Sequence, residues 1–196
     1  MSTQTRNTSI KTMTFGAMLT ALVIVLQLMG SFIKFGPFSI SLVLIPIVIG
    51  AATCGPYMGA WLGAVFGVTV LASGDAAAFM TVNALGTVIT VMVKGIACGF
   101  LSGLTYRLIE KKNQLIAVIA AAIMGPLVNT GIFLAGCALF FLDTIKIWAD
   151  GAGFGGNVVG YMFIGLVGGN FLFELGANLI LSPTIVKLLD YTKKNI

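Results

Sequence analysis

Long apolar runs separated by short polar segments dominate the chain from residue 13 onwards. An α-helix needs about 20 mainly apolar residues to cross a bilayer. The pattern predicts six membrane-spanning helices. The first two lie at 13–33 and 39–53, and the third follows a tight turn at 54–57 and extends to 73. The last three lie at 82–106, 115–141 and 158–188. The second is short and contains Pro46, which predicts a kink or a tilt. We therefore expect an all-α integral membrane protein with six transmembrane helices in one bundle.

The segments outside this bundle are polar. Residues 1–12 predict an unstructured cytoplasmic N-terminal tail, residues 13–188 the transmembrane domain, and residues 189–196 a cytoplasmic C-terminal tail. The longest connection, residues 142–157, is polar and rich in glycine, so we expect a loop there.

Composition supports the membrane class. Hydrophobic residues make up 58% of the chain and charged residues 9%, whereas soluble domains have about 25% charged residues. The net charge of +5 lies mostly in loops and tails, so it does not indicate nucleic-acid binding. Histidine is absent, and the three cysteines are isolated, with no CxxC spacing. We therefore expect no metal and no cofactor.

The basic residues predict the orientation. With both termini in the cytoplasm, the inside segments hold eight of them and the outside loops hold two, Lys34 and Lys146. The eight inside are Arg6, Lys11, Arg107, Lys111, Lys112, Lys187, Lys193 and Lys194. This bias follows the positive-inside rule. We expect a multi-pass protein of the cell membrane with both termini cytoplasmic.

Small residues recur at helical spacing in three of the predicted spans. One ridge consists of Gly55, Gly59, Gly63 and Gly67, and a second of Gly95, Gly99 and Gly103. Such ridges predict close helix contacts, because backbones without side chains can approach each other. Ala17 and Ala21 form a smooth strip one turn apart in the first span. That strip predicts either a docking surface for a partner helix or ordinary packing within this protein.

The fourth predicted span carries a polar stripe. Asn83, Thr87, Thr90 and Lys94 follow i, i+4, i+7, i+11 spacing, which places them on one helical face over about 16 Å. Lys94 lies near mid-span, where a charge costs about 3 kcal/mol. Two interpretations are open for this lysine: a buried structural ion pair, or the floor of a cavity for a polar, anionic solute.

A second stripe in the sixth span consists of Asn170, Glu174 and Asn178, and Asn129 lies at depth in the fifth. Because buried unsatisfied polar groups cost about 1–3 kcal/mol each, we expect the two stripes to face each other, with Asn129 beside them. Lys94 and Glu174 are predicted at similar depth, where they could pair with each other or bind the solute.

Sequence motifs argue against several function classes. The chain has no HExxH, GxSxG or Walker motif, so it is not predicted to be an enzyme or an ATPase. The polar groups are few and mixed in type, unlike the rings of a channel. No inverted repeat supports a self-sufficient secondary transporter. A membrane protein with one solute-binding cavity remains.

Several motifs resemble a known family. They are Ala17-x-x-x-Ala21, Gly55-Pro56-x-x-Gly59, SLVLIPIVIGA (41–51), PLVNTGIF (126–133) and NFLFELGANLILSP (170–183). Over essentially its whole length the chain resembles the substrate-binding S components of energy-coupling factor (ECF) vitamin transporters, most of all the pantothenate type. The resemblance implies ATP-driven uptake with a transmembrane coupling (T) subunit and two ATPase subunits as partners, in contact with membrane lipid. It also implies that Ala17 and Ala21 dock the coupling subunit.

The resemblance implies an outward-opening site built from the first extracellular loop and spans four to six. The candidate substrate-binding residues are Asn83, Thr87, Lys94, Asn129, Asn170 and Glu174. Lys94 suits the carboxylate of pantothenate, and the asparagines suit its hydroxyls and amide. The alternatives are another vitamin, such as riboflavin, or a small membrane assembly protein that binds no solute. Riboflavin-type relatives carry an acidic residue in the first extracellular loop, which reads KFGPFSIS here.

Overall fold

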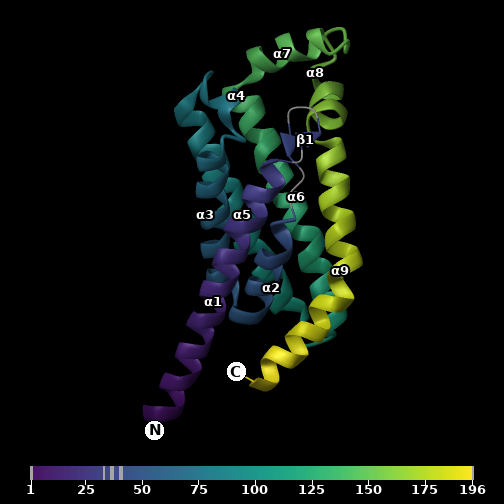
Figure 1. Cartoon of the computed structure of the whole chain (residues 1–196). Helices are drawn as coiled ribbons and strands as arrows, with labels where there is room; N and C mark the ends of the chain where they lie inside the picture. Colours follow the sequence, from purple (N-terminus) through teal and green to yellow (C-terminus); the bar gives the residue numbers. More distant parts are fainter. Residues whose placement is uncertain (1, 33, 36–37, 40–41, 196) are drawn as a thin grey trace.

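Five long apolar helices form the frame of the protein. The computed structural model describes residues 2–32, 34–35, 38–39 and 42–195. The five helices are α1 (Ser2–Ser31), α3 (Pro56–Ser73), α5 (Ala84–Ile109), α6 (Gln114–Phe140) and α9 (Gly168–Asn195). Each contains a stretch long and apolar enough to cross a membrane. The predicted all-α membrane fold is confirmed, and the start of α1 and the end of α9 lie at the same end of the bundle (Figure 1).

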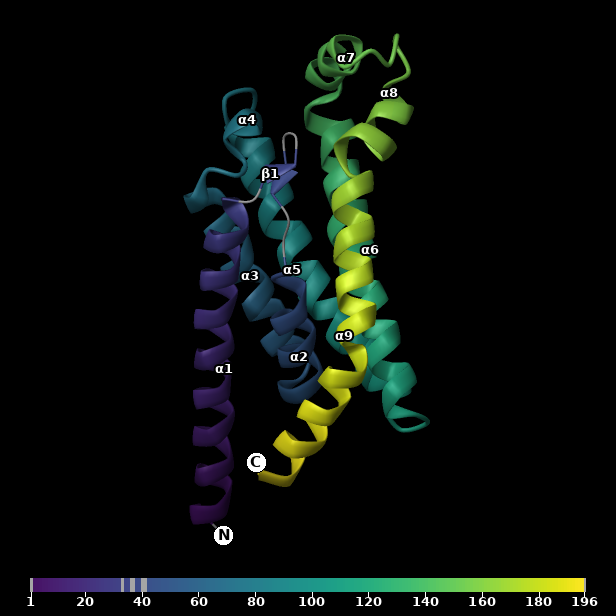
Figure 2. The same cartoon turned by 45° about the vertical axis from the view of Figure 1, so that its right-hand side comes forward.

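A sixth apolar helix, α2 (Leu44–Cys54), is much shorter than the others. Its 11 residues extend only about 16 Å, roughly half of the hydrocarbon thickness of a bilayer. It packs against the surrounding helices in the half of the bundle nearer the chain termini (Figure 2). Pro46 is the third residue of α2, where its missing N–H has no intrahelical partner to lose. The helix therefore continues unbroken through Pro46 to Cys54.

Both tails differ from the prediction. α1 begins at Ser2 rather than near residue 13, and α9 continues to Asn195 rather than ending at 188. No glycine or proline stands between Ser2 and Phe15, or after Pro183, to end either helix. The terminal segments expected to be tails are therefore extensions of the first and last helices.

The remaining elements connect the helices. A short hairpin pairs β1 (Lys34–Phe35) with β2 (Phe38–Ser39). The connections α4 (Ala77–Met80), α7 (Leu142–Gly151) and α8 (Val158–Gly160) lie at the end opposite the termini (Figure 1). A π-helical turn, η1 (Tyr161–Leu166), follows α8 and precedes α9. The predicted sixth span is thus divided before Gly168.

α7 corrects the predicted loop at 142–157. Ile145 and Ala149 lie one turn apart and are fully buried. Asp143 and Lys146 form a 2.9 Å ion pair on the exposed face. One buried pair over ten residues is too short a pattern to separate a helix from a polar loop in the sequence.

The two glycine ridges meet each other. A Cβ placed on Gly63 would fall on the carbonyl oxygen of Gly95, and one on Gly59 would fall on that of Gly99. α3 and α5 are therefore packed backbone to backbone, and the predicted close contact is confirmed.

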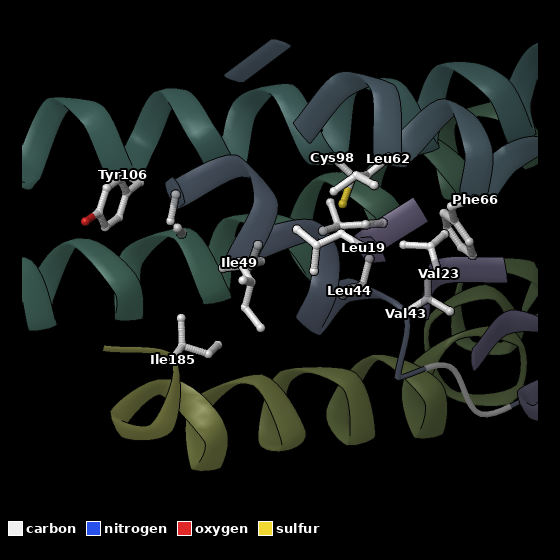
Figure 3. Packing of buried hydrophobic residues seen from close by; sticks show 14 of the residues in the cluster. Leu19, Val23, Val43, Leu44, Ile49, Leu62, Phe66, Cys98, Tyr106 and Ile185 are labelled. Carbon is white, nitrogen blue, oxygen red and sulfur yellow. The ribbon is translucent and has the colours of Figure 1, made fainter. Parts of the chain in front are cut away.

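Next to this contact lies the main apolar core, to which α1, α2, α3, α5, α6 and α9 all contribute buried side chains. Figure 3 shows part of it, including Leu19, Val23, Leu44, Leu62, Phe66, Cys98 and Ile185. Because α2 fills this half of the bundle, the space that remains between the helices lies toward α4 and α7.

Candidate functional site

A cavity opens among the helices in the half of the bundle away from the termini. It contains about 840 Å³ of empty space, solvent at its mouth included. Its lining side chains come from α1, α3, α4, α5, α6, η1 and α9, and from short connections such as the one that joins α3 to α4. No residue of α2 is among those that line it. The cavity is therefore bounded on several sides by different helices and is not a groove between two of them.

Most of the predicted site residues meet in this cavity. Thr87 and Lys94 of α5, Asn129 of α6, and Asn170 and Glu174 of α9 all line it. Thr90, which belongs to the same predicted face of α5, lines the cavity as well. The packing of α5 and α9 therefore turns the two polar stripes toward one space, and Asn129 of α6 lines the same space.

Asn83 and Asn178 lie outside the cavity lining. Asn83 is the N-cap of α5, and its Oδ1 accepts a hydrogen bond of 2.9 Å from the backbone N–H of Gly86. Asn178 is buried and donates through Nδ2 to the carbonyl oxygen of Glu174 at 2.9 Å. The predicted contact of Asn83 with a solute stays a prediction.

Lys94 reaches into an aromatic part of the cavity. Its Nζ lies 5.2 Å from the ring centre of Phe133 and 5.6 Å from that of Phe66, which is within cation–π distance. Among the described residues, no carboxylate comes within ion-pairing distance of this ammonium. Lys94 and Glu174 therefore do not form the ion pair that the sequence allowed.

Glu174 is instead held by an amide. It is 1% exposed, and its Oε1 accepts a 3.1 Å hydrogen bond from Nδ2 of Asn170. Because a carboxylate oxygen accepts here, the amide nitrogen of Asn170 faces Glu174 and the amide oxygen points elsewhere. Three oxygens here have no hydrogen-bond partner in the described part of the chain. They are Oδ1 of Asn170, Oε2 of Glu174 and Oδ1 of Asn129.

A second amide–carboxylate pair lines the same cavity and was not predicted. Gln27 of α1 donates through Nε2 to Oδ2 of Asp75 at 2.6 Å. Gln27 is a strongly polar residue within an apolar run, and that isolation was the one signal available in the sequence. Asp75 follows Gly74, whose φ of 81° ends α3 and turns the chain toward α4. Asp75 lies in a connection between helices, so no helical face marks it in the sequence.

Phenylalanine side chains form the apolar part of the wall, and they were also missed. The lining includes Phe66, Phe79, Phe133 and Phe141. Phe79 makes edge-to-face contacts with Phe133, Phe141 and Trp148, at ring-centre distances of 5.5, 5.1 and 5.3 Å. Since phenylalanine is common in any membrane helix, its presence in the sequence carried no signal for a site.

The unpaired polar groups of the cavity wall are mostly hydrogen-bond acceptors. The buried polar atoms without partners on cavity-lining residues are Oε1 of Gln27, Oγ1 of Thr90, Oδ1 of Asn129, Oδ1 of Asn170 and Oε2 of Glu174. All can accept hydrogen bonds, and only the threonine hydroxyl can also donate. Lys94 adds one ammonium group. The cavity therefore matches a small solute that carries several hydrogen-bond donors, an apolar part and one anionic group.

Fold and cavity together define a multi-pass membrane protein with a binding site for a small polar solute. The family model of the ECF transporter, substrate-specific component, matches residues 11–186, and the chain belongs to this family. It is accordingly a substrate-binding transport subunit of an ECF transporter, a family that works with T and ATPase subunits. No curated protein and no solved structure matches the chain significantly.

Proposed function

We propose that this chain captures pantothenate outside the cell and holds it for ATP-driven uptake by its partner subunits. The observation that carries the proposal is the set of groups around the Lys94 ammonium. Its ammonium lies in the cavity between two phenylalanine rings, with no carboxylate at ion-pairing distance among the described residues. A cation in a low-dielectric site is costly without a counter-charge, and the carboxylate of a solute supplies one.

The other functional groups of pantothenate suit the rest of the wall. Its two hydroxyls and its amide N–H are hydrogen-bond donors, and the amide oxygens of Asn129 and Asn170 are acceptors without partners. Its branched apolar carbon atoms suit the phenylalanine side chains. Each donor placed on such an oxygen removes the cost of a buried unsatisfied group, about 1–3 kcal/mol.

Equilibrium binding of a vitamin panel tests the proposal. Purified protein in detergent is titrated with pantothenate, riboflavin and thiamine in an isothermal calorimeter. Pantothenate is expected to bind, and neither of the other two is expected to compete with it. Binding of riboflavin or thiamine in place of pantothenate would contradict the substrate. Failure to bind any of the three would contradict vitamin capture by this cavity and favour a subunit that only assembles with partners.

A further inference from the structure

We infer that Gln27 is a specificity-determining residue of this site, and that Asp75 is the residue that positions it. In this inference the amide oxygen of Gln27 accepts a hydrogen bond from a hydroxyl or amide donor of the bound solute. The inference rests on the proposed function in that it needs a solute in the cavity. It adds α1 and the α3–α4 connection to a site that the family resemblance builds from the first extracellular loop and spans four to six.

The orientation of the Gln27 amide follows from its partner. A carboxylate accepts hydrogen bonds, so the group that lies 2.6 Å from Oδ2 of Asp75 must be the amide nitrogen. Oε1 is therefore turned away from Asp75. Gln27 is 2% exposed, and this oxygen has no hydrogen-bond partner among the described residues. If Gln27 only linked α1 to the α3–α4 connection, its buried and unpaired oxygen would cost free energy with no contact to offset it.

The same arrangement occurs a second time in the cavity. Asn170 donates to Glu174 and keeps its own oxygen unpaired, as Gln27 does with Asp75. One pair belongs to α9, and the other joins α1 to the segment after α3. Both line the cavity together with Lys94. A solute that fills this space meets oriented amide oxygens on two different walls and one ammonium group.

This geometry predicts what the site rejects. A solute that carried a second anionic group in place of a donor would bring it against an amide oxygen and toward the Asp75 carboxylate. Repulsion between like charges in a partly buried site discriminates strongly against such a compound. We therefore expect the site to select solutes with one anionic group and separate hydroxyl or amide donors, and to exclude their phosphate esters.

Binding measurements on the full chain in detergent test the inference. Gln27→Met keeps the size of the side chain and removes the acceptor. Asp75→Asn offers an amide in place of the carboxylate, so that Gln27 can turn its nitrogen into the cavity. Gln114→Met is the matched control, because Gln114 makes a similar bond of 3.0 Å to Asp190 on the surface, away from the cavity.

We expect both cavity variants to weaken pantothenate binding about tenfold, or about 1.4 kcal/mol, and the control to leave it unchanged. The Asp75→Asn result is the more discriminating, because removal of a negative charge would by itself favour an anionic ligand. Unchanged or tighter binding in both variants, with the folded state intact by thermal melting, overturns the inference.

The same titrations separate this inference from the proposed function. If the wild type binds riboflavin or thiamine instead of pantothenate, and Gln27→Met weakens that binding tenfold, the role of Gln27 stands and the proposed substrate fails. If pantothenate binds equally well to the wild type and to both variants, the substrate stands and the role of Gln27 fails. If no vitamin binds, both fail. Binding of 4′-phosphopantothenate as tightly as pantothenate contradicts the predicted exclusion.

Discussion

Gly63 of α3 and Gly95 of α5 face each other so closely that a Cβ on either residue would lie against the carbonyl oxygen of the other. Gly95→Ala is therefore expected to force the helices apart and to lower the free energy of unfolding by about 1–3 kcal/mol. Thermal unfolding in detergent measures the effect. Gly131→Ala is the matched control, since a Cβ there would meet nothing within 4 Å. Equal melting temperatures for the two variants would show that the α3–α5 contact tolerates separation.

Replacement of Lys94 distinguishes a ligand group from a structural one. Because Lys94 forms no ion pair among the described residues, Lys94→Met should not lower thermal stability. It should weaken the binding of pantothenate at least tenfold, about 1.4 kcal/mol, through loss of the counter-charge. Lys146→Met, on the surface of α7, serves as the control. A variant that loses stability and binds with unchanged affinity would instead make Lys94 a structural residue.

The amide oxygens of Asn129 and Asn170 are predicted to contact the solute. Asn129→Ala and Asn170→Ala should each weaken binding about tenfold, because each removes an acceptor that lines the cavity. Unchanged affinity in both variants would remove these residues from the site.

Asn83→Ala separates the two roles open to that residue. Loss of the cap on α5 should lower stability by about 1 kcal/mol and leave affinity unchanged. Calorimetric titration and thermal melting of the same sample measure the two effects. A loss of affinity at constant stability would instead support the contact with a solute that its position in the polar stripe predicts.

Ala17 and Ala21 are predicted to dock the coupling subunit. Both are exposed on the outer face of α1, whereas Leu19 and Val23 face the core. Ala17→Trp should block assembly and uptake in the complete transporter while solute binding in the isolated subunit continues. Ile180→Trp, on the exposed face of α9, controls for the bulk of the ring. If the alanine variant also loses solute binding, the strip serves the fold of this subunit.

Labelling of engineered cysteines tests the orientation. Lys146 lies in α7 and Lys112 in the turn between α5 and α6, at opposite ends of the bundle (Figure 2). In a background without the native cysteines, Lys146→Cys should react with an impermeant reagent added outside intact cells, and Lys112→Cys should not. The reverse pattern would place the termini outside.

Much of the fold and part of the site follow from local periodicity. The all-α membrane class comes from the length of the apolar runs, and the glycines four residues apart predict that α3 and α5 each have a face for close helix packing. Thr87 and Lys94 share a face of α5 because one helix has a regular pitch, and Asn170 and Glu174 share a face of α9 for the same reason. These features depend only on residues that are close in the chain, so the sequence by itself determines them.

Other features depend on how the helices are rotated and placed against one another. Lys94 and Glu174 could be assigned a similar depth, but the rotation of α5 and α9 directs the lysine toward Phe66 and Phe133 and leaves the glutamate with Asn170. Gln27 and Asp75 are 48 positions apart, and only the packing of α1 beside the end of α3 brings them together. Side-chain pairing across helices is decided by tertiary packing, because no repeat within one helix specifies the neighbour that it will meet.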